Sequence, residues 1–529
     1  MSDRIYLFDT TLRDGAQTQG VDFSAAEKAE IAHALDALGV DYVEGGWPGA
    51  NPTDDAFFGS APQLKRATFT AFGMTRRPGR SVENDPGLQA VLAAETPAVC
   101  LVGKAWDFHV KLALEISNDE NIAMIADSMA HAVGRGREAM FDAEHFFDGY
   151  KSDPAFALAC IEAALDAGAR WAVLCDTNGG TLPGEVGEIV AAVAATVGGE
   201  RLAIHAHNDT GNAVANSLMA VEAGVRQVQG TLNGLGERCG NANLVSLIPT
   251  LKLKTGYETG ISDADLTQLT RSSRLLDELL NRAPDRHAPY VGASAFAHKG
   301  GLHVSAVMKD ARTYEHVPPE SIGNRRHIVV SDQSGKANVL ARLAEAGMEV
   351  DHDHPKLPRL VEEVKSHEFE GYSYDGAEAS FELLARRILG TVPSYFEVES
   401  FRVQVERRHN ALGKLVTISE ATVKVVVDGA RHLSVAEGNG PIDALNHAIS
   451  KDLGKYAEFL GGWRLADYKV RIISPQAGTG AITRVMIESA DDDGMTWNTV
   501  GVSTNIIDAS FQALIDSITY KLLRENAPA

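Results

Sequence analysis

The segment Leu202-Ala-Ile-His205-Ala-His207-Asn208-Asp209 decides the predicted fold, because an apolar run ends there in a cluster of polar side chains. A short run of this kind, bounded by polar residues, predicts a buried β-strand. Similar runs recur along the first half of the chain. We expect strands at Ile5–Asp9, Val40–Glu44, Ala67–Phe72, Ala98–Val102, Glu138–Asp142, Trp171–Cys175, Leu202–Ala206 and Gln227–Leu232.

Longer alanine-rich segments with helical spacing lie between these runs, for example Ser24–Leu38 and Asp153–Ala167. Strands that alternate with helices are typical of a parallel α/β fold. Eight such units fit a closed (β/α)8 TIM barrel. The alternative is an open doubly wound sheet, but the glycine-rich loop expected after its first strand is absent from Thr10–Gly15.

The strongly polar clusters follow the predicted strands directly. In a TIM barrel the active site is built from the loops after the strands, so these clusters should share one end of the barrel. The clusters are Thr10–Gly15, Glu44–Gly46, Glu144–His145, Asp176–Asn178, His205–Asp209 and Asn233–Asn241.

His205 and His207 are two residues apart on a predicted strand, so both imidazoles should face the same side. A carboxylate from another strand end, Asp14, would complete a nitrogen and oxygen ligand set, and Asn241 would add a carbonyl oxygen. Such a set suits Zn²⁺, Mn²⁺, Co²⁺ or Mg²⁺ and leaves positions open for substrate. The alternative interpretation is a pair of ordinary surface or core histidines.

The overall composition excludes several classes of function. A formal net charge of −22 argues against nucleic acid or an anionic membrane surface as a partner, since both attract basic patches. No apolar stretch approaches the length needed to span a bilayer. The first residues lack the features of a signal peptide, and the four cysteines show no CxxC spacing. We therefore expect a cytoplasmic protein with reduced thiols.

Three long motifs carry a family resemblance. The chain has Leu12-Arg13-Asp14-Gly15-x-Gln17 followed by Lys28, then Leu202-x-x-His205-x-His207-Asn208-Asp209-x-Gly211. The third is Asn233-Gly234-x-Gly236-Glu237-Arg238-x-Gly240-Asn241. In this order they resemble the isopropylmalate, homocitrate and citramalate synthase family. The segments Glu44–Pro48 and Phe141–Phe147 look most like its longer citramalate branch.

The resemblance implies a Claisen-type condensation of acetyl-CoA with a short 2-oxo acid, with a divalent metal as cofactor. The citramalate branch implies pyruvate as the 2-oxo acid, whereas the isopropylmalate and homocitrate branches would take other 2-oxo acids, 2-oxoisovalerate in the isopropylmalate case. An enzyme of a different class, a metal-dependent lyase or hydrolase on the same barrel, is the remaining alternative.

Residue roles follow from the same resemblance. Asp14, His205 and His207 match the metal ligands, with Asn241 as a further contact. Arg13 would stabilise the alkoxide that develops on the carbonyl, unless it only forms a structural salt bridge.

Glu144 would contact substrate and help to abstract or relay the acetyl proton, although an exposed loop carboxylate is the competing interpretation. Thr177 would bind the keto-acid carboxylate, or it would simply cap a helix. Glu237 and Arg238 are expected to pair with each other.

Beyond the barrel, a mostly helical stretch from Asp263 to Leu280 leads to Ala297–His303. By resemblance His303, with Tyr314, is a candidate base for enolising acetyl-CoA, and the alternative is ordinary loop histidines. Ser334-Gly335-Lys336 should open another helix, but it lacks the preceding glycines of a phosphate-binding loop.

The C-terminal part contains an internal repeat, in which Val435–Ala448 aligns with Val500–Ala513 at an offset of 65 residues. Val423–Val427 and Arg484–Ile487 are the strand candidates that precede each copy of the loop. The sequence alone permits a plain dimerisation domain. The resemblance implies a regulatory domain that binds an end-product amino acid, with isoleucine the first candidate, in a homodimer.

We therefore expect three parts: a catalytic barrel over residues 1–275, mainly helical linker subdomains over residues 276–395, and an α+β regulatory and dimerisation domain over residues 396–529.

Overall fold

The structure, a computed structural model, describes residues 4–328, 336–451, 453–473, 478 and 480–529. It divides into two compact units, Met1–Phe296 with His316–Arg326, and Ala297–Glu315 with His327–Ala529. No helix among the described residues is long and apolar enough to cross a membrane. The predicted helix start at Ser334-Gly335 lies outside the described residues, and the helix is described from Lys336 onward.

The first unit is a closed barrel of eight parallel strands in chain order, so the TIM-barrel prediction is confirmed. The barrel closes because β1 pairs with both β2 and β8. The strands are β1 Tyr6–Asp9, β2 Tyr42–Glu44, β3 Thr68–Met74, β4 Ala98–Lys104, β5 Glu138–Glu144, β6 Trp171–Asp176, β7 Leu202–Ala206 and β8 Gln227–Gly230.

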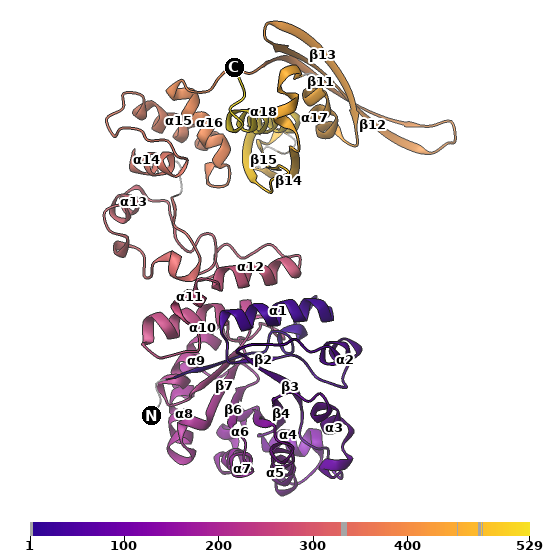
Figure 1. Ribbon diagram of the computed structural model, residues 1–529, viewed down its shortest axis with the longest axis vertical. Coiled ribbons are helices and arrows are strands. Elements are labelled where there is room, and N and C mark those ends of the chain that lie inside the picture. Colours follow the sequence, from indigo (N-terminus) through magenta and orange to yellow (C-terminus); the bar gives the residue numbers. More distant parts are fainter. Residues whose placement is uncertain (1–3, 329–335, 452, 474–477, 479) are drawn as a thin grey trace. The chain divides into compact units, whose positions relative to one another are not determined.

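Helices surround these strands (Figure 1). They are α1 Ala25–Leu38, α2 Pro52–Gly59, α3 Pro86–Ala93, α4 Asp107–His109, α5 Asn118–Gly134, α6 Phe146–Ser152, α7 Pro154–Asp166, α8 Pro183–Val197, α9 Ala213–Glu222, α10 Leu244–Thr250, α11 Asp263–Leu266 and α12 Leu269–Leu279.

Local chemistry fixes the ends of these helices. Ser24 and Glu27 form a reciprocal capping box at the start of α1, and Gly39 ends the helix in a left-handed conformation with φ 96°. Asp153 caps α7 by accepting from the backbone N–H of Phe156. Both helices therefore begin and end within a residue or so of the predicted segments.

Two hydrophobic layers hold the barrel. Side chains from successive strands fill its interior, and a larger apolar cluster lies between the strands and the surrounding helices. Dense packing of this kind fixes the strand ends that carry the polar loops. The interior layer consists of Phe8, Tyr42, Phe72, Ala98, Cys100, Met140 and Trp171.

The second unit begins with short elements and helices. They are β9 Ala297–His298, α13 Gly301–Val307, β10 His327–Ile328, α14 Lys336–Glu345, α15 Leu357–Glu370 and α16 Glu378–Leu389. Side chains of α14, α15 and α16 share one buried apolar cluster, which also includes Val500 from the C-terminal part.

The predicted duplication appears as two copies of the same arrangement. Each copy is a three-stranded antiparallel sheet followed by a helix, and Figure 1 shows the two helices, α17 and α18, beside their sheets. The first copy is β11 Glu397–His409, β12 Leu415–Val427, β13 Ala430–Gly438 and α17 Pro441–Lys451. The second is β14 Arg464–Ile472, β15 Thr483–Ala490, β16 Thr496–Ser503 and α18 Ile506–Arg524.

Candidate metal centre and catalytic pocket

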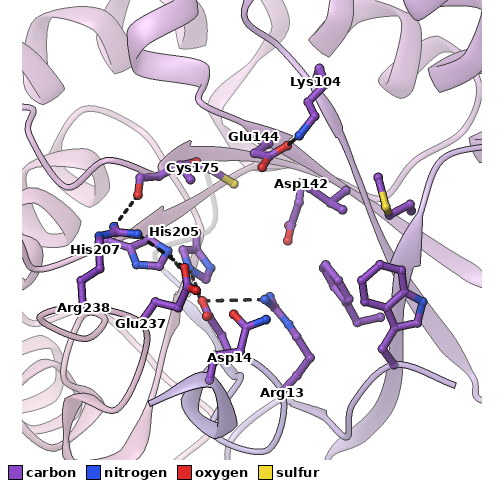
Figure 2. Close-up of a pocket in the computed structure, with 16 residues that line it drawn as sticks. Arg13, Asp14, Lys104, Asp142, Glu144, Cys175, His205, His207, Glu237 and Arg238 are labelled. Atoms are coloured by element: carbon purple, nitrogen blue, oxygen red, sulfur yellow. Dashed lines mark hydrogen bonds and ion pairs between the residues drawn. The ribbon is translucent and has the colours of Figure 1, made fainter. Parts of the chain in front are cut away.

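Three side chains meet at the C-terminal end of the barrel. His205 is the penultimate residue of β7, His207 directly follows the strand on the same side, and Asp14 comes from the turn after β1. One carboxylate oxygen of Asp14 lies 3.1 Å from His205 Nε2 and 3.6 Å from His207 Nε2. The nearest ligand atoms of the three residues all lie within 4.8 Å of one another, which suits a metal ion (Figure 2).

Neighbouring side chains orient these ligands. The carbonyl of the buried Gln229 side chain lies 2.9 Å from His205 Nδ1, so it accepts that N–H and leaves Nε2 turned toward Asp14. A partner of this kind fixes the tautomer of a metal-binding histidine. The sheet explains the contact, because His205 and Gln229 are register partners of β7 and β8.

Asn241 stands beside His207, to which its backbone is bridged. Its amide nitrogen donates to the carbonyl of Leu235 at 3.1 Å. Its Oδ1 is buried and, among the described residues, has no hydrogen-bond partner. A side chain at Gly236 would place its Cβ 2.2 Å from the Asn241 amide, so this close approach requires glycine. The unpartnered oxygen fits a further metal ligand.

The charges of the three residues are interdependent. Burial disfavours the Asp14 carboxylate, but Arg13 and His205 outweigh it and hold the Asp14 pKa far below its usual value. Burial also disfavours charge on His205, yet its hydrogen bond to Asp14 raises the His205 pKa. Burial and the neighbouring His205 lower the pKa of His207 to about 4, so His207 is neutral and able to ligate near neutral pH.

Arg13 is held rigidly beside the three residues. Its Nε donates to the Glu44 carboxylate at 2.7 Å, and Thr10 donates to the same oxygen at 2.5 Å. Its guanidinium lies 3.9 Å from the ring centre of Phe72. Arg13 therefore does form a structural salt bridge, with Glu44. The guanidinium also lines the pocket, and its Nη1 lies 3.8 Å from Asp14.

Arg13, Asp14, His205 and His207 line a cavity of about 350 Å³. Glu144 and Thr177, both predicted from the sequence, line it as well. The sequence reasoning missed Lys104 and Asp142. Lys104 forms an ion pair with Glu144, and Asp142 is buried and accepts from the Cys100 thiol at 3.1 Å. Figure 2 shows the Asp142 carboxylate directed into the pocket.

A signal for Asp142 was present in the sequence. It lies two residues before Glu144 on one strand, so both side chains face the same side. Apolar side chains complete one wall of the cavity: Trp47, Phe72, Met74 and Val102.

The structure changes one loop interpretation, that of Thr177, and adds a partner to another, that of Arg238. Thr177 caps none of the described helices. Its hydroxyl accepts the backbone N–H of His145 at 2.8 Å. Arg238 binds chiefly Asp209, whose two oxygens lie 2.8 and 2.9 Å from its guanidinium, while Glu237 is 3.6 Å away. Arg238 therefore contacts Asp209, on the preceding loop, more closely than its sequence neighbour Glu237, because both Asp209 oxygens lie within hydrogen-bonding distance of the planar guanidinium.

His303 and Tyr314 belong to the second unit. There the structure brings the two together, with stacked rings 4.2 Å apart. Both are exposed, and a neighbouring pair, His298 and Glu315, is buried with 3.1 Å between its nearest atoms. The role of His303 and Tyr314 at the barrel stays a prediction.

Three protein-family models match successive parts of the chain. The HMGL-like family matches residues 4–276, the homocitrate synthase post-HMGL domain-like family matches residues 290–370, and the LeuA allosteric (dimerisation) domain matches residues 375–522.

Curated relatives match almost the whole chain. The (R)-citramalate synthase of Aquifex aeolicus is 50% identical over 99% of this chain and 99% of its own length. The (R)-citramalate synthase of Sulfolobus acidocaldarius is 42% identical over 98% of this chain and 97% of its own length. A probable 2-isopropylmalate synthase of Methanopyrus kandleri is 34% identical over 98% of each.

Proposed function

Because this chain belongs to the HMGL-like family and, over almost its whole length, to the (R)-citramalate synthases, we propose that it joins acetyl-CoA and pyruvate to give (R)-citramalate and CoA. One observation carries the proposal. Five relatives named (R)-citramalate synthase are 42–50% identical across both the barrel and the C-terminal parts. The reaction belongs to the acyltransferases and would serve isoleucine biosynthesis.

Asp14, His205 and His207 would hold the metal, with Asn241 as a further contact. The mixed nitrogen and oxygen donors and the unpartnered Asn241 oxygen support this assignment. A divalent ion such as Zn²⁺, Mn²⁺, Co²⁺ or Mg²⁺ would supply a Lewis acid for the carbonyl of the 2-oxo acid.

The rest of the reaction falls to the chain's own residues. A base removes a proton from the acetyl methyl group, and the resulting enolate carbon attacks the ketone carbon of pyruvate. A carbon–carbon bond forms while negative charge moves onto the ketone oxygen. Arg13, fixed by Glu44 and Phe72, faces that charge and needs no reorganisation to stabilise it. The ketone oxygen then takes up a proton, and water cleaves the thioester to release CoA.

We assign proton handling to Glu144 together with His303 and Tyr314. Glu144 lines the cavity and forms an ion pair with Lys104. Thr177, which also lines the cavity, would hold the carboxylate of pyruvate. His303 and Tyr314 would have to reach the barrel mouth for the acetyl group to be enolised there.

The apolar wall supports pyruvate as the preferred 2-oxo acid. The ring of Trp47 packs edge-on against that of Phe72, with the ring centres 5.4 Å apart, and the Arg13 guanidinium lies over the Phe72 ring. This wall therefore cannot shift outward without moving Arg13. A rigid wall excludes a branched side chain sterically and accepts a methyl group. Preference for 2-oxoisovalerate would instead place the chain with the isopropylmalate synthases.

The C-terminal part supports regulation. We assign the barrel to residues 1–275, the linker to residues 276–395 and a regulatory and dimerisation domain to residues 396–529, in a homodimer. Isoleucine is the proposed effector, acting through unequal affinity for two states of the enzyme. Deletion after Ser400 should abolish its effect on thiol release. The cytoplasmic location stays a prediction.

A free-thiol assay tests the proposed reaction. Acetyl-CoA plus pyruvate should release CoA, and either compound alone should not. A lyase or hydrolase on the same barrel would cleave one substrate without the other. His205→Ala and His207→Ala should abolish release, and thiol release that resists chelators in both variants would remove the metal from the mechanism.

A further inference from the structure

The loop after β2 has little freedom where it delivers Trp47 to the catalytic pocket. A side chain at Gly45 would place its Cβ 2.6 Å from the Phe69 ring. One at Gly46 would place its Cβ 2.6 Å from the Asp54 carboxylate, and Gly46 has a left-handed φ of 144°. The two glycines therefore let the backbone pass closely between its neighbours just before Trp47.

A buried ion pair holds this loop from the side of the helices. Lys28 of α1 and Asp54 of α2 are both buried and form the pair. The Lys28 ammonium also donates to the backbone carbonyl of Gly45 at 3.0 Å. The second carboxylate oxygen of Asp54 accepts the backbone N–H of Trp47 at 2.9 Å and the side-chain amide of Asn51 at 2.9 Å. Both charged groups therefore bind the backbone on either side of Gly46.

Stability alone does not account for such a pair. The cost of removing two charges from water offsets most of their attraction, so two apolar side chains of similar size stabilise a protein about as well. A buried pair can instead specify one geometry, because each charge accepts only a narrow range of partner positions. Here the geometry that is specified is that of the Gly45–Trp47 backbone.

Trp47 is a wall that two cavities share. It lines the catalytic pocket and also a second cavity of about 330 Å³, whose other walls include Pro86 and Leu88 of α3. Met74 lines both cavities as well. The indole packs edge-on against Phe72, so its position follows from the loop backbone and from this aromatic contact.

We propose that the Lys28–Asp54 pair is a positioning device, which holds Trp47 as the partition between the two cavities and so limits the size of the 2-oxo acid. The inference rests on the proposed function, because it names the part of that site that selects the substrate. With the partition in place, the pocket accepts a methyl group. A displaced or truncated Trp47 joins the second cavity to the pocket and makes room for an ethyl or isopropyl group.

The test compares substrates within each variant. Thiol release from acetyl-CoA is measured with pyruvate, 2-oxobutanoate and 2-oxoisovalerate, and kcat/KM for each larger acid is divided by that for pyruvate. This ratio does not depend on the fraction of folded enzyme, so a purely structural defect leaves it unchanged. We expect Trp47→Ala to raise the ratio at least about 10-fold and Asp54→Asn to raise it about 3–10-fold, since one methylene group is worth about 10-fold or more.

The choice of Asp54→Asn follows from the contacts. An amide presents an oxygen on one side only, so asparagine cannot accept from both Lys28 and the Trp47 N–H as the carboxylate does. Asp54→Asn added to Trp47→Ala should not raise the ratio further, because Asp54 acts through Trp47.

Two further variants separate position from stability. Lys28→Met combined with Asp54→Leu replaces the pair by apolar side chains, so it should be folded and yet relax the selectivity about as much as Asp54→Asn. The matched control is Asp36→Asn. Asp36 is a buried carboxylate on α1 that accepts the backbone N–H groups of residues 65–67, before β3. The control should lower the melting temperature and leave the ratio unchanged.

A second readout needs no turnover. Labelling with 5-fluorotryptophan gives one fluorine resonance for each of the five tryptophans, and Trp47→Phe assigns that of Trp47. Asp54→Asn should broaden or split the Trp47 resonance, because the indole then samples more than one position. Asp36→Asn should leave the resonance as it is in the wild type.

Three results overturn the proposal. The first is a wild-type ratio in whichever of Asp54→Asn and the Lys28→Met, Asp54→Leu protein is folded. The second is an equal relaxation of the ratio in Asp36→Asn, and the third is an unchanged Trp47 resonance in Asp54→Asn. A wild type that releases no thiol with any 2-oxo acid refutes the proposed function instead, and the fluorine resonance then decides whether Asp54 positions Trp47.

Discussion

Gln229→Leu tests how much the contact that orients His205 contributes to metal binding, without changing any of the proposed metal ligands. The substitution keeps an uncharged side chain at a buried position but removes the oxygen that accepts from His205 Nδ1 at 2.9 Å. His205 then loses the contact that selects its tautomer, and a buried N–H loses its partner. All three proposed protein ligands stay in place, so any loss of metal affinity comes from their orientation.

Two independent ranges give the magnitude for the same lost contact. A buried donor left without an acceptor costs about 1–3 kcal/mol. Partners that orient metal-binding histidines typically contribute about 10–100-fold in metal affinity, which is roughly 1.4–2.8 kcal/mol. The two ranges agree because they describe the same lost contact. We therefore expect the dissociation constant for Zn²⁺ or Mn²⁺ to rise by about 10–100-fold.

The assay is competition of the metal-free protein with a chromophoric chelator. Gln227→Leu is the matched control, because Gln227 is an equally buried glutamine on the same strand whose side chain contacts Met140 and Gln229 rather than His205. The control should change the dissociation constant by less than about twofold, since its contacts are weak. Equal affinity in Gln229→Leu and the wild type would refute the reasoning that this contact orients His205.

Three more predictions concern Arg13, the protonation of His205 and the buried ion pair between Lys28 and Asp54. Arg13→Lys should lower the thiol-release rate by about 10²–10³-fold in steady-state assays, because a lysine cannot bind Glu44 and lie on Phe72 at once. Metal affinity measured by calorimetry should rise as the pH is raised above about 6.5, the ordinary pKa of histidine, since the raised pKa of His205 keeps a proton there that metal must displace. Lys28→Met should lower the free energy of unfolding by about 3–5 kcal/mol in denaturant titrations, because it leaves the buried Asp54 carboxylate unpaired, and Asp54→Leu added to it should restore much of the loss.

The strands were predictable because each combines a short apolar run with a polar end. The last predicted strand extended too far, to Leu232, whereas β8 ends at Gly230. The backbone turns there, where the Leu232 N–H donates to the Thr11 hydroxyl and Asn233 adopts a left-handed φ of 57°. That hydrogen bond joins residues far apart in the sequence, so periodicity alone cannot reveal it.

The site was predictable where one strand carries the signal. His205 and His207 follow from period-two spacing, and Asp142 would have followed from its spacing to Glu144. The role of Gln229 could not be predicted in this way, because it depends on the register between β7 and β8. The predicted pair of Arg238 with Glu237 is present at 3.6 Å, but its closer partner Asp209 was missed for the same reason, since Asp209 lies on a different loop.

The most direct test of the central claim follows carbon atoms. Acetyl-CoA labelled with carbon-13 in its methyl group is incubated with unlabelled pyruvate and the metal-loaded enzyme, and the product is followed by NMR. The account predicts label in the methylene carbon of citramalate and none in its methyl group, with no product after metal removal. Labelled acetate without citramalate, or a labelled product formed only when 2-oxoisovalerate replaces pyruvate, would contradict it.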